Sequence, residues 1–125
     1  MAAQLARLPD AELEVMQALW SLGEYPAHTA DIAARLNRDW KAPTLLKLLS
    51  RLEERGFVRG EKAGRVNLYT PLVEREAYVE EESRSFLERL HGGSLSSLVA
   101  ALCPDTRLTE EDVAVLERIL GKEES

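Results

Sequence analysis

The chain has 125 residues, of which 45% are hydrophobic and 6% aromatic, and its net charge is −6. This length fits one small domain, or a domain with an appendage, and the composition is that of an ordinary soluble helical protein. The longest apolar stretch is far short of the roughly 20 residues that a membrane helix needs, and the N-terminal segment lacks the pattern of a signal peptide. The single cysteine, Cys103, cannot form an internal disulfide, so we expect a cytoplasmic protein without membrane insertion.

Two helices are predicted in the first 40 residues. The first spans about residues 9–22, where early acidic side chains favour a helix N-terminus and apolar residues recur at helical spacing. Residues 27–29 could form a short extended segment that pairs with a strand. Thr29 is predicted to cap the second helix, which covers about residues 30–37 and presents one apolar face.

The third predicted helix has two chemically different sides. It runs from about Pro43 to Arg55, with proline in its first turn and Gly56 after its end. Leucines at helical spacing form the side that faces the core. On the other side the spacing brings together Thr44, Lys47 and Arg51.

A β-hairpin is predicted after the third helix. Residues 57–62 and 65–71 are two extended segments on either side of a short turn at Ala63 and Gly64. Three short helices followed by a two-stranded ribbon predict a winged helix-turn-helix, a mainly α fold with a small β-hairpin wing. We assign this DNA-binding domain to residues 1–72.

The remainder, residues 73–125, is predicted to be a helical dimerisation segment. A helix covers about residues 73–90, Gly92 and Gly93 break it, and Ser94 can cap a short helix that ends near Pro104. The last helix begins after Thr109, with Asp112 in capping-box position, and is expected to close at Gly121. Apolar side chains on these helices are expected to form the local and inter-subunit core; they are Phe86, Leu87, Leu90, Leu95, Leu98, Val99, Leu102, Leu116 and Ile119.

The charges are distributed unevenly along the chain. Residues 1–70 carry ten basic and nine acidic side chains, whereas residues 71–125 carry six basic and 13 acidic ones. Between Arg35 and Arg65 nine basic side chains stand against four acidic ones. Screening confines each charge to about 8–10 Å, so this local patch can bind phosphates although the chain as a whole is acidic. The plainer interpretation is a solvated helix face.

The basic patch makes the third helix the candidate recognition helix. A helix fits the major groove of duplex DNA, where arginine or lysine can bind guanine or hold phosphates. The small hairpin turn would let the backbone approach the minor groove or neighbouring phosphates. The expected DNA-binding residues are Lys41, Thr44, Lys47 and Arg51 at the helix, and Lys62 and Arg65 at the hairpin.

Four segments, in order, resemble one known family. Residues 44–56, TLLKLLSRLEERG, resemble the recognition-helix signature of the BlaI/MecI/CopY family of penicillinase-type repressors. Residues 11–20 resemble that family's first helix, and residues 64–71 resemble its wing. Residues 87–99 resemble its dimerisation segment, so the likeness covers about residues 8–120.

The resemblance implies a homodimer that binds a dyad-symmetric operator in double-stranded DNA and represses the genes downstream. It also implies a membrane sensor-protease as a possible partner, because such a protease inactivates the penicillinase branch by cutting an Asn–Phe bond. The corresponding place here holds Ala101-Leu102, which departs from that pattern. Copper-sensing members carry a C-terminal cysteine cluster, whereas this chain has only Cys103.

Enzymes and metalloproteins find little support in the sequence. His28 and His91 have no metal-ligand spacing with each other or with Cys103, and no phosphate-binding loop or catalytic motif is present. We therefore expect no catalytic residue, no metal and no cofactor. One alternative stays open, a winged-helix protein-interaction module that binds no DNA, which the acidic total and Leu46 on the third helix favour.

Overall fold

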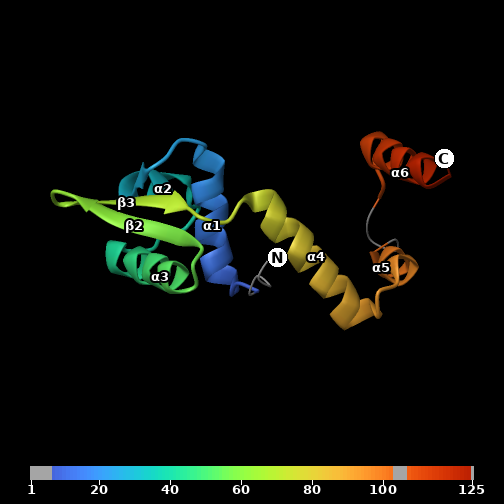
Figure 1. Ribbon diagram of the computed structural model, residues 1–125, viewed down its shortest axis with the longest axis horizontal. Helices are drawn as coiled ribbons and strands as arrows, with labels where there is room; N and C mark the ends of the chain where they lie inside the picture. Colours follow the sequence, from blue (N-terminus) through green and yellow to red (C-terminus); the bar gives the residue numbers. More distant parts are fainter. Residues whose placement is uncertain (1–6, 103–106, 125) are drawn as a thin grey trace. The chain divides into compact units, whose positions relative to one another are not determined.

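A computed structural model describes residues 7–102 and 107–124 (Figure 1). The chain divides into two compact units, and the boundary between them lies between Ser83 and Arg84. Predictions that concern Cys103 and the first six residues lie outside the described part. The functional division that we placed after residue 72 stays a prediction.

In the described residues the first unit contains three complete helices, the beginning of a fourth and a three-stranded antiparallel sheet, as expected for a winged helix-turn-helix. The sheet has the strand order β1-β3-β2, and the β2–β3 hairpin extends past the neighbouring helices (Figure 1). The predicted extended segment near residue 27 is confirmed as β1, which pairs with β3. The elements are α1 (Asp10–Leu22), β1 (Ala27–His28), α2 (Thr29–Arg35), α3 (Ala42–Glu54), β2 (Val58–Ala63) and β3 (Val66–Pro71).

The core of this unit is apolar and draws on every helix in it. The predicted leucine stripe of α3 is confirmed, since all four of its leucines are buried. Burial of this stripe is the main reason why α3 forms here, because burying one such side chain contributes about 1.5–3 kcal/mol. The most deeply buried apolar side chains are Val15, Met16, Leu19, Ile32, Leu49, Leu52, Phe57 and Val58.

Gly60 allows strand β2 to pack closely against α3. A β-carbon at this position would lie 3.0 Å from the Glu53 carboxylate and 3.1 Å from the Tyr69 ring. In the register of the hairpin, Gly60 pairs with Tyr69 and Lys62 pairs with Asn67. Because side chains alternate along a strand, Gly60 and Lys62 share the face that points toward α3.

Three helices follow the hairpin: α4 (Arg75–His91), α5 (Leu95–Leu102) and α6 (Glu110–Glu124). Two of the predicted caps are confirmed. The Ser94 hydroxyl accepts a hydrogen bond from the Ser97 amide at 3.1 Å. At α6, the Thr109 amide donates to Asp112 at 2.9 Å and the Asp112 amide donates to the Thr109 hydroxyl at 3.0 Å. None of the side chains described between residues 84 and 124 is buried.

Two predicted helix ends were wrong. The N-cap of α2 is His28, and Thr29 is already the first helical residue. The helix therefore starts one residue early, with His28 and Asp31 forming the capping box. At the other end of the chain, α6 continues past Gly121 to Glu124, because Gly121 does not adopt the left-handed conformation that ends a helix.

Candidate nucleic-acid interface

The outer side of α3 is open to solvent. Thr44, Lys47 and Arg51 are all exposed, and they lie opposite the buried leucines. Lys41, the N-cap residue of α3, is exposed as well, and Pro43 stands in the first turn. The helix therefore presents polar and cationic groups to solvent along its length, with its apolar side held in the core.

Three of the nine cations between residues 35 and 65 are occupied within the protein. Arg35 donates at 3.0 Å to both the carbonyl and the hydroxyl of Ser21. Arg38 donates two hydrogen bonds to Glu14, at 2.8 and 2.7 Å. The Arg55 Nε lies 2.6 Å from the Glu12 carboxylate. In the structure these three side chains make their contacts within the protein.

The other six cations are exposed, and within the described residues none has an ion-pair or hydrogen-bond partner. Five of them belong to the DNA-binding set expected from the sequence, and the sixth is Arg59. An exposed cation without a carboxylate partner is available to a phosphate. The structure therefore distinguishes the three cations that are paired within the protein from the six that could bind phosphates. The six are Lys41, Lys47, Arg51, Arg59, Lys62 and Arg65.

The two faces of the hairpin differ. Lys62 lies on the face that points toward α3, together with Asn67 opposite it, whereas Arg59 and Glu61 point the other way. Asn67 is half-buried and was not predicted from the sequence. The strand register would have indicated it, because a residue directly opposite Lys62 must share its face.

The remaining predicted hairpin residue, Arg65, lies at the tip of the wing. It follows Gly64 between β2 and β3, and its side chain is exposed.

Further along β3, burial raises the pKa of Tyr69, and the nearby charge of Glu53 raises it further. Tyr69 therefore keeps its proton at neutral pH, and its buried side chain is uncharged.

Two ion pairs position α3 and the turn before it. Glu12 is 1% exposed, so its pairing with Arg55 fastens the end of α3 to the first turn of α1. Arg38 lies in the α2–α3 connection, where its hydrogen bonds hold the pKa of Glu14 below its ordinary value. The Arg38 guanidinium also lies 5.5 Å from the Trp40 ring centroid, a cation–π distance.

Trp20 and Trp40 are both half-buried and pack against the apolar cluster. Across the described ranges no three histidine, cysteine or carboxylate side chains gather in a way that could hold a metal ion. No helix in those ranges has the length and apolar character to cross a membrane.

A family profile described as penicillinase repressor matches residues 8–122, nearly the whole chain. This chain belongs to the penicillinase repressor family. The family consists of transcriptional repressors and not of enzymes. The membership agrees with the resemblance of the α3 segment and with the winged-helix fold.

Individual members of the penicillinase repressor family align along most of this chain. The penicillinase repressor of Bacillus licheniformis is 33% identical over 119 residues, which covers 94% of this chain and 91% of that protein. The methicillin resistance regulatory protein MecI of Staphylococcus aureus strain N315 is 27% identical, covering 92% and 94%. The solution structure of the DNA binding domain of the repressor BlaI is 30% identical with a TM-score of 0.51, covering 62% of this chain and 94% of that one.

Proposed function

We propose that this protein represses transcription by binding, as a homodimer, a dyad-symmetric operator in double-stranded DNA. The observation that carries the proposal is the outer face of α3, where Thr44, Lys47 and Arg51 are exposed and free of protein partners among the described residues. Membership of a repressor family supports it, as does the likeness to the DNA binding domain of BlaI.

In this proposal α3 enters the major groove. Lys47 and Arg51 are exposed one turn apart, and each can bind guanine O6 and N7 or hold a phosphate. Thr44 contacts a base edge or a phosphate near the start of the helix. Lys41, Lys62 and Arg65 then contact the sugar-phosphate backbone on either side, which sets the register of the protein on the duplex.

The second unit supplies the dimer interface in this proposal. Most of its apolar side chains are exposed within a single subunit, and a partner chain would remove them from water. Dimers of helix-turn-helix proteins bind half-sites about 34 Å apart, which is one turn of DNA, or at a multiple of it. The interface residues proposed are Phe86, Leu87, Leu90, Leu95, Leu98, Val99, Leu102, Leu116 and Ile119.

Functionally, we assign residues 1–72 to DNA binding and residues 73–125 to dimerisation, and we place the protein in the cytoplasm, where it would meet its operator.

A membrane sensor-protease is a further candidate partner. The bond at Ala101-Leu102 lies within α5 and is not Asn–Phe. Release by that particular cut is therefore not part of the proposal.

Titration against the DNA upstream of the protein's own gene tests the proposal. A coding fragment of equal length serves as the control, and both are titrated at several salt concentrations. We expect the upstream fragment to bind more tightly, with affinity falling steeply as salt rises because phosphate contacts release counterions. Absence of binding to either fragment would favour the interaction-module alternative.

A further inference from the structure

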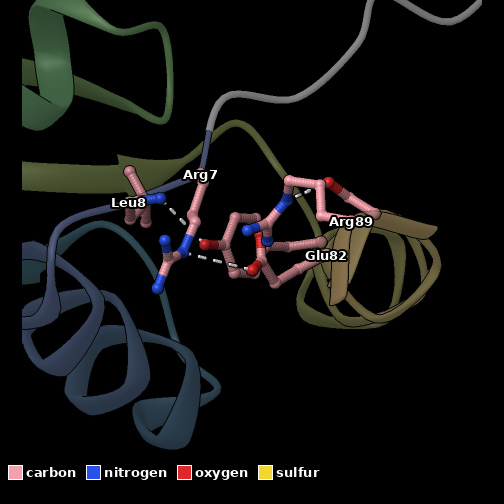
Figure 2. Close-up of polar contacts among 6 residues, drawn as sticks. Arg7, Leu8, Glu82 and Arg89 are labelled. Carbon is pink, nitrogen blue, oxygen red and sulfur yellow. Dashed lines mark hydrogen bonds and ion pairs between the residues drawn. The ribbon is translucent and has the colours of Figure 1, made fainter. Parts of the chain in front are cut away.

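Leu46 differs from nearly all other leucines of the first unit, because its side chain is exposed to solvent. The other four leucines of α3 are 0–8% exposed, whereas Leu46 is 37% exposed. Even Leu8, in the segment that precedes α1, is buried, and its amide donates to the Tyr78 hydroxyl at 3.0 Å (Figure 2). Among the described leucines of this unit, only Leu46 and Leu72 are exposed. Leu46 is thus an exception on the very helix that carries the proposed DNA contacts.

Leu46 belongs to an uncharged row of side chains on the outer side of α3. Pro43, Leu46 and Ser50 are all exposed, and their spacing of three and four residues places them along one line of the helix. Each member of this row directly precedes, in the sequence, a member of a second row. The second row contains the proposed DNA contacts of the helix, which are Thr44, Lys47 and Arg51. The two rows therefore lie next to each other, so the outer side of α3 has an apolar part beside its polar part.

The uncharged row lies on the side of α3 that is next to the wing. Glu53, three residues after Ser50, continues its line, and a β-carbon at Gly60 of β2 would lie 3.0 Å from the Glu53 carboxylate. From there the hairpin runs back along α3 toward the beginning of the helix (Figure 1). Lys62 follows Gly60 by two residues and shares its face. Leu46 is therefore flanked by cations on both sides, those of α3 on one and Lys62 of the wing on the other.

A leucine side chain can recognise only one feature on the edges of the bases. In the major groove the edge of thymine carries a methyl group, whereas guanine, adenine and cytosine offer hydrogen-bonding groups there. Leucine against this methyl group buries apolar surface on both partners. Against another base it would cover a donor or an acceptor without replacing its hydrogen bond to water, which is unfavourable. An aliphatic side chain between cations can therefore select thymine while its neighbours hold phosphates.

We propose that Leu46 contacts the methyl group of one thymine in each half-site of the operator and so determines the base pair at that position. The inference rests on the proposed function above. It adds a contact that distinguishes bases by an apolar group and not by a hydrogen bond. In the sequence, the same leucine favours a protein-interaction module; in this proposal its exposure serves DNA recognition.

Replacing thymine with deoxyuridine tests this contact, because deoxyuridine lacks only the methyl group and pairs with adenine in the same way. The probe is a duplex that the wild-type protein selects from a random-sequence pool. Each thymine of the half-sites is then replaced in turn, in both half-sites at once. Wild type, Leu46→Ala and the control Leu72→Ala, at the other exposed leucine, are titrated against all duplexes at one salt concentration. Circular dichroism confirms that each variant is folded.

We expect wild type and Leu72→Ala to lose about fourfold in affinity per half-site at one thymine, the amount that corresponds to one methyl group no longer buried. Leu46→Ala should bind the unmodified duplex more weakly, and at that thymine the loss on replacement should shrink to less than about twofold. At all other thymines its response should equal that of wild type, since the rest of α3 is unchanged.

A second variant, Leu46→Gln, keeps the length of the side chain but ends in an amide. Glutamine pairs with adenine through two hydrogen bonds in the major groove and has no preference for a methyl group. When this variant selects its own duplexes from the random pool, they should no longer favour thymine at the position in question.

Two results would overturn the inference alone: a wild type that responds to no thymine replacement, or a folded Leu46→Ala that responds as wild type does at every thymine. If Leu46→Ala does not fold, Leu46→Gln decides, and duplexes that keep the same thymine overturn the inference. A wild-type protein that selects no duplex at all would instead overturn the proposed function, so the two failures are distinguishable.

Discussion

Arg51 and Arg55 are one helical turn apart, and the structure gives them opposite roles. Arg55 lies against the buried Glu12 carboxylate, whereas Arg51 is exposed and has no ion-pair partner in the described chain. By residue type and position alone, both would look equally suited to DNA binding. The difference arises because Glu12 is 43 positions away from Arg55 in the sequence, and local spacing carries no information about a contact of that range.

Replacing Arg51 with alanine is expected to weaken operator binding by about 1–3 kcal/mol, the usual contribution of an arginine that reads a base. The matched control is Arg107→Ala, which removes the same charge from an exposed position in the second unit. Titrations at one fixed salt concentration compare the two variants. Equal affinity for Arg51→Ala and wild type would remove Arg51 from the interface.

The Glu14–Arg38 pair predicts a small dependence of stability on acid pH. Hydrogen bonds from Arg38 lower the pKa of Glu14 in the folded protein, so the folded state binds a proton less readily than the unfolded chain. The stabilisation is complete above the ordinary glutamate pKa and is lost as the pH falls through the lower, folded value. Urea unfolding of wild type and Glu14→Gln should therefore differ at neutral pH and converge in acid; a difference that stays constant would contradict it.

The exposure of Thr44, Lys47 and Arg51 could be predicted from the sequence because it depends on local patterns. The helical spacing of Thr44, Lys47 and Arg51 and their position opposite a leucine stripe are properties of a single helix. The position of Asn67 beside Lys62 was not predicted, because it depends on the register of two strands. The occupation of Arg35 and Arg38 was also beyond the sequence, since both partners belong to α1.

At the scale of elements, α3 is held to α1 by a buried charge as well as by leucines. Removing the partner with Arg55→Ala would leave the Glu12 carboxylate buried and unpaired, which should destabilise the fold by about 3 kcal/mol. Arg38→Ala breaks an exposed pair and should cost much less. Urea unfolding measures the free energy of unfolding of both variants. A similarly small loss of stability in the two would show that the Glu12–Arg55 pair does not contribute to the stability of the fold.

The two faces of β2 allow a test of the wing with equal changes of charge. Lys62 shares the face that points toward α3, and Arg59 points away from it. Lys62→Ala should reduce the slope of log affinity against log salt by about one, because one phosphate is no longer neutralised, with no change in sequence preference. Arg59→Ala should leave the slope as it is; the reverse result would place the other face of the wing on the DNA.

The order and type of the elements were predicted well, and their ends less so. Buried stripes, proline in a first turn and reciprocal caps are local signals, which is why α3 and the start of α6 could be located. The start of α2 was misplaced because His28 and Thr29 compete for one cap position. At Gly121 the residue type permitted an ending, but the backbone stayed helical.

For the whole molecule, the apolar surface of the second unit predicts self-association. Leu95 is 59% exposed in the single chain, and placing a carboxylate there should prevent a partner from covering it. Leu95→Glu is therefore expected to sediment as a monomer and wild type as a dimer. Leu72→Glu, at a similarly exposed leucine outside the proposed interface, is the control and should remain a dimer. If Leu95→Glu sediments as a dimer, Leu95 does not lie in the dimer interface.

None of the described side chains between residues 84 and 124 is buried in the single chain. This exposure has a consequence for gene regulation. If these helices gain their shelter only from a second copy, their order depends on how many copies a cell contains. Occupancy of the operator would then follow roughly the square of the subunit number while monomers predominate. A modest dilution of the repressor, as in a growing and dividing cell, would therefore increase transcription of the gene more abruptly than it would for a repressor that binds as a monomer.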